Sequence, residues 1–174
     1  MDGWKCFRGM LNWVNLSTPT ALALARVTGC RVVAGPSGLH FALGYSPILP
    51  IAGAFTMGNV VFFRPRFTDP SKYPQLVAHE ETHSTQYAIC LGLPFIVLYF
   101  VAAGYSWLRT GDPASANLFE RSAGLQSGGY EQRPTRNPLP QLAKSLGTRS
   151  KTLRKRNLVK SEGFRGPTAE GEIH

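Results

Sequence analysis

The sequence has little cysteine and little charge. Three cysteines among 174 residues are too few for the disulfide framework of a small secreted scaffold, and Cys6 and Cys30 are expected to be plain thiols of a reducing compartment. Charged residues make up 17% of the chain, against about 25% in an average globular protein, so long stretches avoid charge. The N-terminus lacks a continuous apolar run followed by a cleavage site, which argues against a secretory signal.

The positive charge is concentrated at the C-terminal end. Residues 131–174 contain 10 Lys/Arg and 4 Asp/Glu, whereas residues 1–130 contain 9 and 6. Residues 131–174 also have few large apolar side chains and several prolines, so they cannot bury enough apolar surface to offset the entropy of ordering. We predict a folded domain over 1–130 and a disordered basic tail over 131–174. The cluster from Arg149 to Lys160 could attract anionic lipid or nucleic acid by charge alone.

The order of the expected elements predicts an α+β fold, because strands come first and helices follow. The N-terminal segment, Met1 to Leu16, carries aromatic and apolar residues among Lys5 and Arg8 and is expected to dock on the body of the domain. A short helix is expected next, from Thr18 to about Thr28, and then a small antiparallel or mixed sheet and three further helices. The expected ranges are a hairpin over 30–45, a strand over 54–63, and helices over 71–91, 94–109 and 114–124.

The first of these three helices contains His79-Glu80-Glu81-Thr82-His83, an HExxH motif. Residues at i and i+4 lie on one face of a helix, so both imidazoles can converge on one ion. Glu80 lies about 100° round the helix and can take a proton from a water molecule on that ion. Zinc lowers the pKa of such a water to about 7, which makes it a nucleophile at neutral pH. The motif therefore predicts a zinc hydrolase with Glu80 as general base.

A catalytic zinc site needs a third protein ligand and an open fourth position. Cys90 lies too far along the helix, and Asp112 is expected in a turn. His40 falls in the predicted hairpin and His174 at the end of the tail. Glu120 on the third helix completes a His₂Glu site if the second helix doubles back past the motif.

The residues His79-Glu80-Glu81-Thr82-His83-Ser84-Thr85-Gln86 and the Asn-x-x-Glu-x-x-Ala pattern of 117–123 resemble a family of small, uncharacterised bacterial proteins of the zincin metallopeptidase class (gluzincin type). The resemblance covers about 54–124 and departs from the common pattern at Leu118, where proline is usual. It implies His79, His83 and Glu120 as zinc ligands and Glu80 as the base. It also implies that an edge strand within 55–63 runs beside the active helix and can pair with an extended peptide substrate.

Three further side chains are candidates for roles around the metal. Gln86 lies on the same stripe as His83 and is expected either to orient a ligand, to touch substrate, or simply to lie at the wet edge of the helix. Asn117, one turn before Glu120, is a candidate for the same kind of support. Tyr130 is a candidate donor to a developing oxyanion.

Two other readings of the chain stay open at the level of sequence. Residues 88–108 are nearly all apolar and about long enough to span a bilayer, but Pro94 is expected to split them, which favours a buried core helix. The chain is therefore expected in the cytoplasm or at a membrane.

The rival function is a non-enzymatic protein that binds an anionic membrane through the tail, with a structural or vestigial metal site. Binding of nucleic acid through the tail is less in keeping with its composition.

Overall fold

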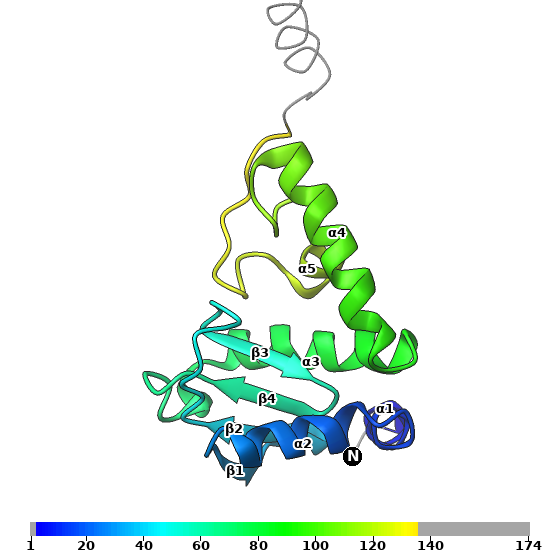
Figure 1. Ribbon diagram of the computed structural model, residues 1–174, viewed down its shortest axis with the longest axis vertical. Helices are drawn as coiled ribbons and strands as arrows, with labels where there is room; N and C mark the ends of the chain where they lie inside the picture. Colours follow the sequence, from blue (N-terminus) through cyan, green and yellow to red (C-terminus); the bar gives the residue numbers. More distant parts are fainter. Residues whose placement is uncertain (1–2, 136–174) are drawn as a thin grey trace, which may run out of the picture. The chain divides into compact units, whose positions relative to one another are not determined.

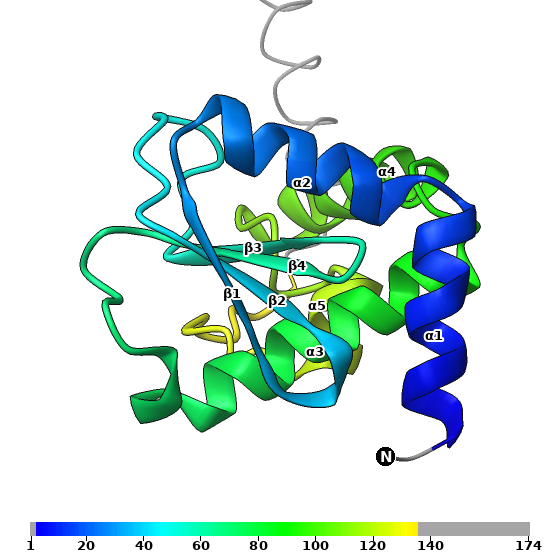
Figure 2. The ribbon, with the colours of Figure 1, turned by 90° about the horizontal axis from the view of Figure 1, so that it is seen from below.

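A four-stranded mixed sheet lies at the centre of the fold (Figures 1 and 2). The computed structural model describes residues 3–135. The strand order is β1-β2-β4-β3; β1 pairs with β2 and β3 with β4 in antiparallel fashion, whereas β2 and β4 are parallel. This mixed sheet with its helices confirms the predicted α+β class. The strands are β1 (Arg31–Ala34), β2 (His40–Leu43), β3 (Ala54–Met57) and β4 (Val60–Phe63).

Within residues 3–135, five helices accompany the sheet. Short 3₁₀ turns at Pro36–Gly38 and Pro70–Lys72 precede β2 and α3. The helices are α1 (Gly3–Val14), α2 (Ser17–Val27), α3 (Pro74–Ile89), α4 (Pro94–Thr110) and α5 (Leu118–Ala123).

The core lies on both faces of the sheet. On one face, Ala21 and Ala25 of α2 pack with Val60 and Phe62. On the other face, Val77 of α3 belongs to a cluster with the alternate β4 side chains and with β2. Figure 2 shows α2 and α3 on opposite sides of the strands. All four residues of β4 are buried, because helices cover both faces of this interior strand.

The predicted strand over 54–63 is wrong as a single element. It is a hairpin in which Gly58, with φ of 58°, and Asn59 form the turn between β3 and β4. Asn59 is buried, and its side chain donates to Gly9 O and accepts from Asn12. The edge strand beside α3 is therefore β3 alone, since β4 lies inside the sheet.

The predicted helices exist with shifted ends. Helix α3 begins at Pro74 rather than at 71, because residues 70–72 form the separate 3₁₀ turn. The last helix begins only at Leu118 rather than at 114, because the Asn117 side chain caps it by accepting from Phe119 N. The predicted disorder of the tail concerns mainly residues 136–174, which lie outside the described residues. Residues 131–135 are described, and Ser115 hydrogen-bonds Glu131 O and Arg133 N.

The apolar segment 88–108 is divided as expected. Helix α3 ends at Ile89, and helix α4 begins at Pro94 and runs to Thr110. Within residues 3–135, no helix alone has both the length and the apolar character to cross a bilayer; α3 and α4 meet that test only as a pair, bent by 117° at the break.

Candidate metal centre

Helix α3 brings the HExxH motif to the edge of the sheet. The helix packs against β3, and His79, Glu80 and His83 are all buried. The two imidazoles lie one turn apart, with 3.1 Å between their Nε2 atoms. The spacing of four residues between His79 and His83 therefore places both rings on one face of the helix, as predicted from the sequence.

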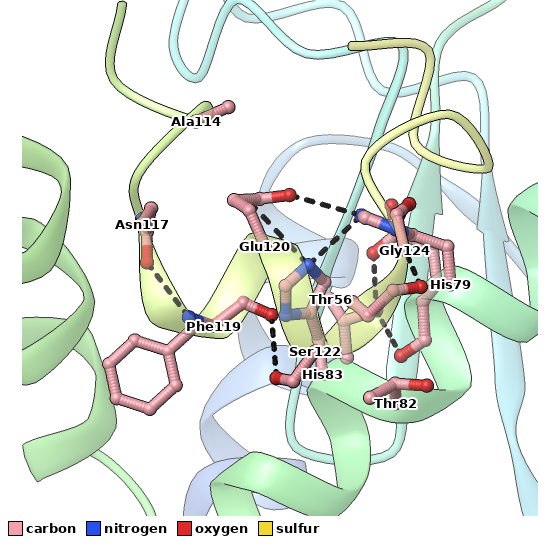
Figure 3. Close-up of polar contacts among 12 residues, drawn as sticks. Thr56, His79, Thr82, His83, Ala114, Asn117, Phe119, Glu120, Ser122 and Gly124 are labelled. Atoms are coloured by element: carbon pink, nitrogen blue, oxygen red, sulfur yellow. Dashed lines mark hydrogen bonds and ion pairs between the residues drawn. The ribbon is translucent and has the colours of Figure 1, made fainter. Parts of the chain in front are cut away.

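Helix α5 supplies the third group. The chain leaves α3 through α4 and returns through a turn in which Asp112 accepts hydrogen bonds from Ala114 N and Ser115 N. The return places Glu120 over the two histidines, where its side chain is only 2% exposed. Its Oε2 lies 3.3 Å from Nε2 of His79, and its Oε1 lies 3.6 Å from Nε2 of His83. Figure 3 shows the three side chains pointing toward one another.

Both histidines are held by their Nδ1 atoms. His79 Nδ1 lies 3.0 Å from Gly124 O and 3.2 Å from Ala123 O, and His83 Nδ1 lies 2.7 Å from Oε1 of Gln86. Oxygens of this kind only accept, so Nδ1 carries the hydrogen in each ring. It follows that both neutral rings present a bare Nε2 lone pair to the same point.

Facing lone pairs repel unless a cation or a proton lies between them. Two imidazole nitrogens and a carboxylate meet here, and Oε2 of Glu120 is buried with no hydrogen-bond partner. One ligand atom from each of the three residues can be chosen so that all lie within 4.8 Å of one another. The group of His79, His83 and Glu120 could therefore hold a metal ion, and its donor atoms are those that a divalent transition metal takes.

The charges of the site act on one another. Burial lowers the pKa of His79, but the Glu120 and Glu80 carboxylates and the carbonyl of Gly124 outweigh it, so the pKa is raised. Burial raises the pKa of Glu120, but the two histidines and Tyr99 outweigh it, so the pKa is lowered. Each group therefore favours the charged form of its partner, which makes the site receptive to positive charge.

Glu80 is placed differently from Glu120. Its Oε2 accepts a hydrogen bond of 2.7 Å from the hydroxyl of Thr56 on β3, and its side chain lines the same cavity as the histidines. Burial raises its pKa, and the neighbouring His83 and the Thr56 hydroxyl only partly oppose this. Glu80 is thus a buried carboxyl beside the three-residue group and not part of it.

A cavity of about 670 Å³ opens beside the three-residue group. Besides the site residues, its walls are mostly apolar side chains of the 49–52 segment, of β3 and of α4. Tyr130 also lines it, and burial raises the pKa of that phenol, which therefore stays protonated and able to donate.

Two further residues at the candidate metal centre, Tyr99 and Gly128, were not predicted from the sequence. Tyr99 on α4 donates its phenolic hydrogen to Oε1 of Glu120. Gly128 lies so close behind His79 that a Cβ there would be 2.5 Å from Cε1 of the ring. Neither position carries a local motif; both depend on how α4 and the segment after α5 fold back over α3.

The remaining candidates are placed as follows. Gln86 accepts a hydrogen bond from His83, which matches the predicted role of orienting a ligand. It also links α3 to α5 by donating to Phe119 O and to Ser122. Asn117 does not touch the three-residue group; it caps α5. Cys90 ends α3, His40 lies on β2, and Asp112 stabilises the turn before α5, so none of these joins the group. His174 lies outside the described residues.

Comparison with known protein families, with curated proteins and with solved structures finds no match to this chain.

Proposed function

We propose that this protein is a zinc-dependent metallopeptidase of the zincin type, which hydrolyses a peptide or amide bond. The observation that carries the proposal is the convergence of three ligand side chains, with both Nδ1 atoms occupied, beside a fourth buried carboxyl that is not a ligand. Three protein ligands are what catalytic zinc sites use, since a fourth position must stay open. Iron(II) also takes two histidines and a carboxylate, so the identity of the metal is part of the test.

Zinc bound to His79, His83 and Glu120 would supply Lewis acidity, which acidifies a water molecule and polarises a substrate carbonyl. The chain's own residues do the rest. Glu80, held by Thr56, accepts the proton of the attacking water and returns it to the leaving nitrogen.

Other side chains position the ligands. Gln86 and the carbonyl of Gly124 keep the imidazoles oriented, and Tyr99 does the same for the Glu120 carboxylate. Tyr130 faces the cavity with a protonated hydroxyl that can donate to a developing oxyanion.

The walls of the cavity favour an apolar substrate. Phe55 and Met57 on β3 and Phe95 and Ile96 on α4 line it. Because β3 is an edge strand, its outer backbone groups are available to an extended peptide. We therefore expect cleavage of peptides that carry a large apolar side chain next to the scissile bond.

Glu80→Gln tests the proposal. The variant keeps the size of the side chain and cannot take a proton, so zinc stays bound while hydrolysis of a quenched fluorescent peptide library falls by at least about 100-fold. Glu131→Gln is the matched control, because Glu131 is exposed and is not among the residues that line the cavity. Full activity in Glu80→Gln would overturn the mechanism. A zinc-loaded wild type that cleaves no peptide or amide would favour a structural metal site.

A further inference from the structure

Helix α1 is buried on its polar side. Its buried residues are Arg8 and Asn12, which bond to Glu81 and Ser84 on α3 and to Asn59. Its aromatic and apolar side chains are exposed instead, among them Trp4, Phe7, Met10 and Trp13. The expected docking on the body occurs, but through the opposite face from the apolar one. An amphipathic helix that turns its apolar side outward leaves that side for a partner.

Helix α4 also exposes apolar side chains. Phe95, Tyr99 and Ala103 face the interior, whereas Val101 on the outer side is 67% exposed. Between its start at Pro94 and Arg109 the helix has no charged residue at all. The exposed members of α4 are Val97, Leu98, Phe100, Val101, Tyr105, Trp107 and Leu108.

The two helices form one surface with the segment between α3 and α4. Gly92 packs against the side chain of Asn15, which directly follows α1. The neighbouring Ile89 and Leu91 are exposed as well. In Figure 1, α1, this segment and α4 follow one another along the right-hand side of the molecule. We call the exposed apolar side chains of α1, 89–93 and α4 the outer apolar face.

The composition of this face points to one kind of partner. Helices α1 and α4 contain no acidic residue, and Lys5 and Arg109 are their partly exposed basic residues. All three tryptophans of the chain, Trp4, Trp13 and Trp107, are exposed on it. Tryptophan and basic residues around an apolar surface suit the interface between lipid headgroups and acyl chains.

The net charge favours a membrane over a second copy as the partner. The chain carries +9 at pH 7, so two copies repel each other, whereas an anionic lipid surface attracts the chain. We propose that the outer apolar face docks on the surface of an anionic lipid bilayer. Phe100 belongs both to this face and to the lining of the cavity, so docking brings the mouth of the cavity next to the membrane. The inference stands independently of the proposed peptidase activity.

The experiment is flotation of the full chain with lipid vesicles. We expect the wild type to float with phosphatidylcholine–phosphatidylglycerol vesicles and much less with pure phosphatidylcholine. Tryptophan fluorescence should shift to the blue and be quenched by brominated acyl chains. Val101→Asp and Leu108→Asp each place a charge on the outer apolar face and should weaken binding about tenfold or more. Val27→Asp is the matched control, because Val27 is 85% exposed at the end of α2 and should leave binding unchanged.

Three outcomes would overturn the proposal. One is a wild type that floats with neither kind of vesicle. Another is equal binding by wild type, Val101→Asp and Leu108→Asp, which would assign attraction to the basic residues elsewhere in the chain. The third is a dimer, measured by sedimentation, that Val101→Asp dissociates while no form binds vesicles. Because Val101 and Leu108 are exposed, both variants should keep the unfolding midpoint of the wild type, which circular dichroism checks.

Discussion

Gln86 accepts a hydrogen bond of 2.7 Å from Nδ1 of His83, and its amide nitrogen donates to Phe119 O and Ser122 on α5. One side chain thus orients a candidate ligand on α3 and ties that helix to the element that carries Glu120. Gln86 is therefore buried beside the candidate metal centre and supports one of its histidines, rather than lying at a wet edge of the helix.

Replacing Gln86 by leucine should weaken the binding of zinc. The imidazole of His83 loses the acceptor that fixes its orientation, and such supports are typically worth about 10–100-fold in metal affinity. Competition with a fluorescent zinc chelator measures the change. Gln132→Leu serves as the control, since Gln132 is exposed. An unchanged affinity in Gln86→Leu would show that the packing of the ring alone holds His83.

Thr56→Val should lower turnover while leaving the metal in place. The hydroxyl of Thr56 donates to Oε2 of Glu80 and holds the proposed base toward the cavity, and valine has nearly the same shape without the donor. We expect kcat to fall about tenfold, with zinc content equal to that of the wild type. Thr56→Ser, which restores the donor, should recover most of the activity. Loss of zinc together with turnover would make Thr56 part of the structural frame instead.

Glu81 stabilises the fold, although it lies within the motif. Its Oε1 accepts a hydrogen bond of 2.9 Å from Arg8, a side chain that is only 1% exposed, and it also pairs with Lys5. Glu81→Gln leaves the guanidinium buried without its countercharge. We expect the free energy of unfolding, measured in urea, to fall by about 1–3 kcal/mol, with the stoichiometry of zinc unchanged. A loss of zinc in this variant, with the fold intact, would contradict this division of roles.

Asp112 makes part of the stability dependent on acid pH. Burial raises the pKa of this carboxyl, but hydrogen bonds from Ser115 and Ala114 and the charge of Arg133 outweigh it, so the pKa lies below its ordinary value of 3.8. A carboxyl with a depressed pKa stabilises the fold above its unfolded value and loses that contribution as the pH falls through its folded value.

The corresponding measurement is thermal unfolding of the metal-free protein from about pH 5 to about pH 3. We expect Asp112→Asn to be less stable than the wild type at about pH 5, by an amount on the order of 1 kcal/mol, because the group is partly exposed to solvent. The two proteins should approach each other as the pH falls. Parallel curves across this range would show that the ionisation of Asp112 contributes nothing.

Much of the site could be predicted because its determinants are local. The two histidines and Glu80 follow from the geometry of a single helix, and the division of the apolar segment follows from Pro94. Glu120 is a candidate both because the third helix passes the motif if the second helix doubles back and because its surroundings resemble a zincin pattern, and the structure places it over the histidines. In each case the residues that determine the feature lie close together in the sequence.

The rest depends on contacts between distant segments. Tyr99 has no motif, and it reaches Glu120 only because α4 leads the chain away and the turn at Asp112 brings it back. The burial of the polar side of α1 could not be predicted from local sequence either, because Glu81, the partner of Arg8, lies 73 residues further along the chain. The β3–β4 hairpin is different: the pair Gly58-Asn59 between two apolar runs is a local turn signal, which the prediction of a single strand over 54–63 overlooked.

The most direct test of the metal centre is the metal content of the purified full chain by elemental mass spectrometry after zinc is supplied. Wild type, His83→Ala, Glu120→Ala and the control His40→Ala are compared, since His40 lies on β2 away from the group. We predict one zinc ion per chain in wild type and His40→Ala, and its loss in His83→Ala and Glu120→Ala. A wild type without metal, or a Glu120→Ala variant that keeps its full complement, would contradict the account.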